Sequence, residues 1–149
     1  MRIKQFIETY QSNDAPRMIG FSATTSKNEE ECVIGSSLTF YSDEDDERLG
    51  HTNDYAVNIN TFGNDNMMSL ILGHEFGHWI NFHLKGGDFN EEEEEEQIAH
   101  MTSYLLNDND ERLNIFLVDT PKVTEEAKRR LYILESLDIN VLYDSKTKY

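Results

Sequence analysis

Two histidines and a glutamate stand close together in a segment with the pattern H-E-x-x-H, which reads His74-Glu75-Phe76-Gly77-His78. On a helix, residues four positions apart lie on one face, one turn from each other. Two neutral imidazoles at this spacing can hold one Zn²⁺ ion, and the glutamate projects beside the same ion. A carboxylate at that place can take a proton from water and pass it on. The spacing therefore predicts a metal centre that supports hydrolysis.

The residues around this motif favour a largely buried helix over a chance match on a surface helix. They are mostly apolar, and include Met67, Met68, Leu70, Ile71, Leu72, Phe76, Trp79, Ile80 and Phe82. Polar groups that are buried without a partner are costly, so a His-Glu-His set in this context needs a functional reason. We expect a helix over about residues 65–84, which Asn64 or Asp65 could cap and which Gly86-Gly87 would end.

A catalytic zinc usually takes three protein ligands and leaves one position for water. One form of the motif supplies the third ligand as a histidine that follows a glycine, but Asn81 and Leu84 occupy those two positions here. His83 lies five residues after His78, so on a helix it would point well away from the pair. The third ligand must therefore come from another segment.

A glutamate from a following helix is the other solution, and residues 91–96 are all glutamates. Most of such a run is expected to form a solvated face. We favour Glu96, because it opens the segment Glu96-Gln97-Ile98-Ala99, in which a small residue one turn later lets two helices approach closely. Glu95 and Glu92 remain alternatives. Asp88 is less favoured, because Gly86-Gly87-Asp88 is typical of a turn.

Length and composition indicate one acidic domain over residues 1–149, with a formal net charge of −16. Such a charge repels nucleic acid and anionic membranes and favours basic partners. No apolar run reaches the length of a membrane span, and the first residues lack a signal-peptide pattern. The single cysteine, Cys32, fits a reducing compartment. We therefore expect a cytoplasmic protein that binds neither nucleic acid nor a membrane directly; its oligomeric state is left open.

Hydrophobic periodicity divides the rest of the chain into short helices and strands. We expect further helices over about residues 2–12 and 97–106 and from 120 onward, and strands over about 17–25, 31–41 and 55–60. Residues 26–30 are expected to form a polar turn and residues 43–54 a charged loop. The pattern leaves 111–118 open between helix and strand, and 140–143 between strand and coil. The alternating strand over 55–60 suits a sheet edge, to which an extended substrate could add by backbone pairing.

The motif and its neighbours resemble the ImmA/IrrE family of zinc metallopeptidases, gluzincins that phages and mobile elements often encode. The resemblance covers roughly residues 55–106: a strand, a helix with H-E-x-G-H, and a helix with Glu96-Gln97-Ile98-Ala99 and Leu105-Leu106. It implies an α+β fold, a minimal zincin-like domain in which a small three-stranded sheet packs on the H-E-x-x-H helix and on a following helix that carries the glutamate. The family usually has Asn or Asp where this chain has His100, and proline where it has Asn107.

The resemblance implies peptide-bond hydrolysis in a protein substrate, with a transcriptional regulator as the expected target. Zn²⁺ would be held by His74, His78 and Glu96, and Glu75 would act as the general base. The oxyanion needs one more donor, for which the candidates in falling order are His100, Tyr104, His51 and Tyr55. His100 could instead hydrogen-bond a ligand imidazole.

Two other functions are compatible with the sequence. The first is a non-hydrolytic acidic binding protein or DNA mimic with a structural or vestigial zinc site. The intact Glu75 argues against it, because a structural site needs no base. The second is a protease inhibited by its own chain through Cys32, although a lone cysteine in a strand is more often a small buried apolar residue.

Overall fold

The computed structural model describes residues 1–11, 15–28, 30–84, 92–116 and 120–145. Helices and strands both contribute to this part of the chain, so the expected α+β class is confirmed. The elements are α1 (Ile3–Tyr10), β1 (Arg17–Asn28), β2 (Glu30–Tyr41), β3 (Gly50–Thr52), β4 (Ala56–Asn60), a 3₁₀ turn (Asp65–Met67), α2 (Met68–Asn81), α3 (Glu92–Leu106), α4 (Asp110–Ile115), α5 (Pro121–Ser136) and β5 (Asp138–Asp144).

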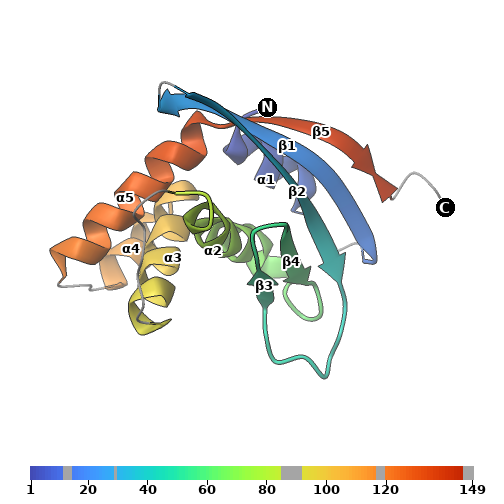
Figure 1. Cartoon of the computed structure of the whole chain (residues 1–149). Coiled ribbons are helices and arrows are strands. Elements are labelled where there is room, and N and C mark those ends of the chain that lie inside the picture. The colour runs from blue at the N-terminus through green and yellow to red at the C-terminus, as the bar shows by residue number, and fades with distance from the viewer. Residues whose placement is uncertain (12–14, 29, 85–91, 117–119, 146–149) are drawn as a thin grey trace.

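The strands form one mixed sheet in the order β3-β4-β2-β1-β5 (Figure 1). β4 runs parallel to β2, and the other neighbours are antiparallel. The sheet therefore has five strands, and the expectation of three is wrong. The two additional strands, β3 and β5, lie at the two edges of the sheet. β3 has only three residues, and β5 includes residues 140–143, which the sequence leaves open between strand and coil.

Three expectations about the strands need correction. The expected turn over 26–30 is mostly strand, because β1 continues to Asn28 and β2 begins at Glu30. The expected charged loop over 43–54 contains β3. The strand expected at the sheet edge is β4, which is hydrogen-bonded on both sides, to β2 and to β3. The free edge beside the motif helix therefore belongs to β3.

The sheet arches over α1 and α2 (Figure 1). Ile19, Phe21 and Ala23 of β1 are fully buried. The ring of Phe21 lies 6.1 Å from that of Phe76 and 5.8 Å from that of Trp79, both on α2. Buried aromatic side chains contribute strongly to a small core. This packing fixes α2, and with it the motif, against the sheet.

The glutamate run belongs to α3, which begins at Glu92 and not near residue 97 as expected. Carboxylates in a first turn are favourable because they face the positive end of the helix dipole. In the segment that the sequence leaves open between helix and strand, residues 111–115 belong to α4, and residues 140–143 are part of β5. The motif helix α2 ends at Asn81, so the expectation that it runs to about residue 84 and is ended by Gly86-Gly87 is wrong. Among the residues that are described, no helix combines the length and the apolar composition needed to cross a bilayer.

Candidate metal centre

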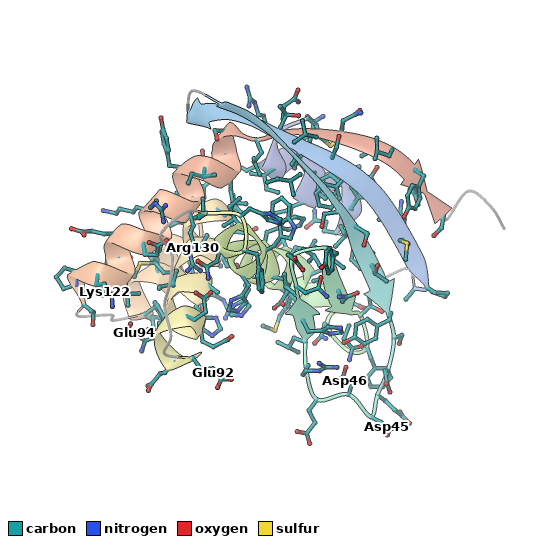
Figure 2. All side chains as sticks on the ribbon, viewed as in Figure 1. Asp45, Asp46, Glu92, Glu94, Lys122 and Arg130 are labelled. Atoms are coloured by element: carbon teal, nitrogen blue, oxygen red, sulfur yellow. The ribbon has the colours of Figure 1, made fainter. Side chains whose placement is uncertain are left out.

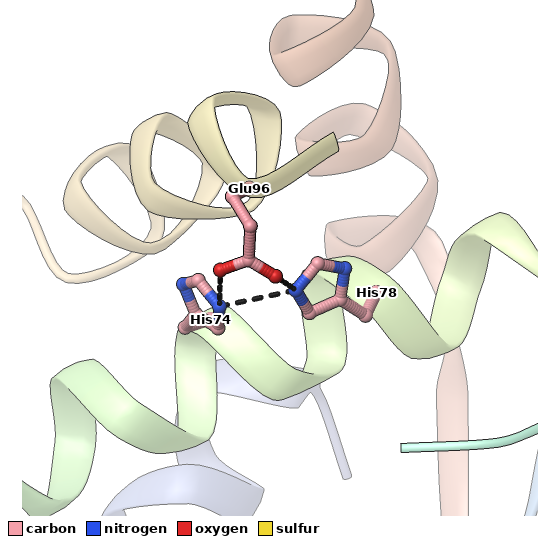
Figure 3. Close-up of side chains that lie close together, drawn as sticks. All are labelled: His74, His78 and Glu96. Carbon is pink, nitrogen blue, oxygen red and sulfur yellow. Dashed lines mark hydrogen bonds and ion pairs between the residues drawn. The ribbon is translucent and has the colours of Figure 1, made fainter. Parts of the chain in front are cut away.

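Two histidines of α2 and one glutamate of α3 bring three potential ligand atoms together (Figure 3). Nε2 of His74 lies 3.0 Å from Nε2 of His78. The carboxylate of Glu96 reaches both rings, with Oε2 3.1 Å from His74 Nε2 and Oε1 2.9 Å from His78 Nε2. Of the glutamates considered from sequence, Glu96 is thus the one whose oxygens face both ring nitrogens.

The spacing of these atoms fits a small divalent ion. Ligand bonds of about 2.0–2.1 Å at tetrahedral angles place neighbouring ligand atoms about 3.3 Å apart. The two imidazole nitrogens lie 3.0 Å apart, close to that value, and each of them lies 2.9–3.1 Å from one of the two oxygens of Glu96. Two imidazoles and one carboxylate are also the donor set that hydrolytic zinc centres use. The three residues can therefore form a metal site and leave one side open.

Glu75 faces the same region from the next position of α2. Its Oε2 lies 3.8 Å from His74 Nε2, and its side chain is only 7% exposed. Thr52 of β3 donates a hydrogen bond from Oγ1 to Glu75 Oε1 at 2.8 Å. Burial raises the pKa of the Glu75 carboxyl, and the Thr52 hydrogen bond opposes that rise. A buried, oriented carboxylate with a raised pKa is suited to accept a proton near neutral pH.

Glu95, the alternative third ligand, lies behind His78 and not beside Glu96. His78 Nδ1 donates to Glu95 Oε2 at 2.7 Å, and Arg130 of α5 donates to both oxygens of the same carboxylate. Burial alone would raise the pKa of Glu95, but the hydrogen bonds from Arg130 and His78 outweigh it and lower that pKa. Glu92, the other alternative, lies at the cavity wall and is exposed.

His100 of α3 contacts the other ligand, with its Nδ1 3.2 Å from Nδ1 of His74. If His74 binds a metal through Nε2, its Nδ1 carries the proton and His100 Nδ1 can accept it. Burial, followed by the charges of His78 and His100, lowers the pKa of His74 to about 3. For His78, burial acts to lower the pKa, but the Glu95 hydrogen bond and the charge of Glu96 outweigh it and raise that pKa.

The other side chains considered from sequence, as oxyanion donors or as a ligand, lie at different places relative to the triad. Tyr104 stacks on His100 with ring centroids 6.3 Å apart and lines the same cavity. His51 of β3 also lines the cavity, 3.5 Å from the hydroxyl of Tyr41. Tyr55 is 72% exposed and does not line the cavity. His83 lies apart from the triad, with Nε2 3.1 Å from the carbonyl oxygen of Asp54.

The triad opens into a cavity of about 790 Å³ between α2, α3 and β3. Besides the ligands, its wall includes apolar side chains and two arginines: Leu49, Met67, Leu70, Ile71, Phe82, Arg48 and Arg112. Cavities of this size accept several residues of an extended peptide or a ligand of similar volume. The side chain of Cys32 lies outside what the structure describes.

Sequence reasoning missed three residues of this site: Thr52 and Gly50 on β3, and Arg130 on α5. A Cβ on Gly50 would lie 3.0 Å from Glu75 Cγ, so β3 approaches the motif helix too closely for a side chain there. For β3 the sequence carries no signal, because its three residues stand in a charged segment. Arg130 does carry one: it stands between the apolar residues of an amphipathic helix, which is unusual for a charged side chain.

Comparison with protein-family models, with curated proteins and with solved structures finds no match to this chain.

Proposed function

We propose that this protein is a zinc-dependent metallopeptidase that hydrolyses a peptide bond in a protein substrate. The observation that carries the proposal is the convergence of His74, His78 and Glu96 beside the buried carboxylate of Glu75. A purely structural zinc site is usually closed by four protein ligands and needs no base. Here three ligands, one base and an open cavity occur together.

The residues of the chain divide the reaction between them. His74, His78 and Glu96 would hold the ion, which supplies Lewis-acid activation when bound. Glu75 takes a proton from the attacking water and delivers it to the leaving amine, while Thr52 keeps its carboxylate oriented. The developing oxyanion needs a further donor, and Tyr104 and His51 both line the cavity where such a donor would lie.

The free edge of β3 supplies a way to hold an extended substrate. Hydrogen bonds from Asn60 N to the oxygen of Leu49 and from Asn53 N to the oxygen of Ala56 flank the His51–Asn58 pair, so the backbone groups of His51 point towards β4. In an antiparallel pair the direction alternates, so the backbone groups of Gly50 and Thr52 point away from β4. Both residues line the cavity. A peptide that adds to this edge would lie across the open side of the triad, as peptides do in other strand-addition complexes.

The charge of the protein favours a basic target. A formal net charge of −16 attracts positively charged proteins from a distance, and DNA-binding proteins are basic. We therefore propose a transcriptional regulator as the substrate. This part of the proposal follows from charge and from the family resemblance, and it is independent of the metal chemistry.

The test is the metal content of the purified protein, measured by elemental analysis on wild type, Glu96→Ala and Glu75→Gln. We expect one zinc per chain in wild type, its loss in Glu96→Ala and its retention in Glu75→Gln. A cleavage assay on basic proteins follows, in which Glu75→Gln is the matched inactive control. A wild-type protein that stays free of zinc after supplementation would contradict the proposal and favour the acidic binding protein or DNA mimic.

A further inference from the structure

A fully buried arginine lies behind the candidate metal centre. Arg130 of α5 is 0% exposed and projects from α5 towards α2 and α3 (Figure 2). Its Nη1 and Nη2 donate to the two oxygens of Glu95 at 2.7 and 2.6 Å. Paired, parallel hydrogen bonds of this kind are strong and fix the plane of the carboxylate. Arg130 comes from a part of the chain beyond residues 55–106, which carry the family resemblance.

The carboxylate that Arg130 holds is the acceptor for a ligand imidazole. Glu95 Oε2 accepts from Arg130 Nη1 and also from His78 Nδ1, both at 2.7 Å. A hydrogen bond at Nδ1 requires the proton there and leaves the lone pair of Nε2 free for a metal. That Nε2 is the atom 2.9 Å from Glu96 Oε1. Arg130, Glu95 and His78 therefore form one continuous chain of contacts that ends at the metal site.

Arg130 contacts the backbone of the motif as well. Its Nη1 lies 3.3 Å from the carbonyl oxygen of Gly77, the residue directly before His78. One guanidinium thus touches both the helix turn that carries His78 and the carboxylate that orients its ring. Removing it would release both restraints on that ligand.

We propose that Arg130 is a positioning residue of the metal centre, which holds Glu95 as the acceptor for His78 and leaves Glu96 as the ligand. Adjacent residues on a helix point about 100° apart, so only one of the two glutamates can face the imidazole pair at a time. The ion pair with Arg130 commits Glu95 to the outer side of His78. This inference rests on the proposed zinc site and explains which glutamate of a uniform run becomes its ligand.

The competing explanation is that the Arg130–Glu95 ion pair only fastens α5 to α3. A single substitution does not separate the two roles, because it leaves one charge buried without its partner, which is strongly destabilising. The double variant Glu95→Met/Arg130→Met removes both charges and the acceptor for His78 Nδ1, and keeps side chains of similar length. Glu126, which also accepts from Arg130 Nε at 3.4 Å, keeps its ion pair with Arg129. A neutral replacement of a buried ion pair is often tolerated. If the pair only fastens the helices, this variant binds zinc as wild type does.

The experiment measures zinc affinity by competition with a chromogenic chelator, on the full chain, for wild type, the double variant and Arg129→Met. Arg129 is the control, because it is an arginine of the same helix, is 40% exposed and pairs with Glu126, as Arg130 Nε also does, while the two hydrogen bonds to Glu95 come from Arg130. We expect zinc affinity to fall about 10- to 100-fold in the double variant, as for other residues that orient a metal ligand, and to be unchanged in Arg129→Met. The visible spectrum of the Co²⁺ form should change in the double variant only.

The measured zinc affinities test the role of Arg130 and the proposed zinc site separately. If the double variant loses less than about threefold in zinc affinity, the role of Arg130 would be overturned. Such a loss is well below the loss expected for a residue that orients a metal ligand. Wild type that binds no zinc would instead overturn the proposed function. If the double variant does not fold, Arg130→Lys replaces it, because an ammonium keeps the charge but lacks the planar fork. A wild-type zinc affinity and Co²⁺ spectrum in Arg130→Lys would also overturn the proposal.

Discussion

Gly77 of α2 faces Ala99 of α3 so closely that a Cβ on Gly77 would lie 3.4 Å from the Cα of Ala99. Gly77 is the neighbour of His78, and Ala99 follows Glu96 by one helical turn. The two small residues thus set how near the carboxylate of Glu96 comes to the imidazole of His78. The dimensions of the metal site depend on this contact between two apolar positions.

Enlarging Ala99 should therefore open the metal site. We expect Ala99→Leu to push α3 from α2, with an overpacking cost of about 1–3 kcal/mol in the free energy of unfolding. Zinc affinity should fall at least about tenfold, since the carboxylate of Glu96 would be displaced. Ala99→Gly is the control, because it preserves the close approach. Chemical denaturation and zinc titration measure the two effects, and undiminished zinc binding by Ala99→Leu would contradict this account of the contact.

Replacing His100 should distinguish the two roles that sequence leaves open for it. If it orients His74, His100→Ala lowers zinc affinity about 10- to 100-fold, and His100→Asn recovers much of the loss because an amide oxygen accepts the same proton. If it stabilises the oxyanion, zinc affinity stays constant and kcat falls. The 3.2 Å contact between the two Nδ1 atoms favours the first result. Zinc titration beside steady-state kinetics decides between them.

Removing the hydroxyl of Thr52 should shift the pH dependence of catalysis. The pKa of Glu75 is raised by burial and held back by the Thr52 hydrogen bond, so Thr52→Val should let it rise further. Glu75 acts as a base only when it is deprotonated, so the acid limb of kcat/KM should move to higher pH. Activity would then be lost first on the acidic side, while zinc content stays the same. An acid limb that does not move would remove Thr52 from this role.

Adding a methyl group to Gly50 should damage the edge strand beside Glu75. A Cβ there would lie 2.6 Å from the carbonyl oxygen of Asn58, inside the sheet. We expect Gly50→Ala to destabilise the protein by about 1–3 kcal/mol and to reduce activity, because β3 must move. Gly35 of β2 is the matched control, since a Cβ there meets nothing within 4 Å. Thermal unfolding of both variants compares them, and equal stabilities would contradict the prediction.

The parts of the fold that sequence predicts well are those with a strong local period. Ile3, Phe6, Ile7 and Tyr10 recur at helical spacing, and all four are buried on α1 as the pattern indicates. The motif helix is likewise found, although its first turn, from Asp65 to Met67, is a 3₁₀ turn. In such segments the apolar residues whose spacing predicts the helix are also the residues that are buried against the core.

Residues whose role depends on distant partners are beyond this kind of prediction. Gly50 and Thr52 form a strand because β4 lies beside them, and their own segment is charged and irregular in sequence. Glu95 and Glu96 are identical in type and adjacent, and the sequence favours Glu96 as the ligand only through the small residue Ala99 one turn later. In the structure, Glu95 differs from Glu96 because it pairs with Arg130, which lies 35 positions further along the chain. Such long-range pairs become visible only when the helices are placed in space.

The pairing of β1 with β5 also has a consequence for the newly made protein. One edge of β1 is occupied by β2, which follows at once, and the other by β5, which the ribosome makes only after α5. The contacts that order the whole domain therefore join the early and late parts of the chain, and folds of this kind form slowly. The second edge of β1 therefore stays unpaired in the growing chain until β5 has been made.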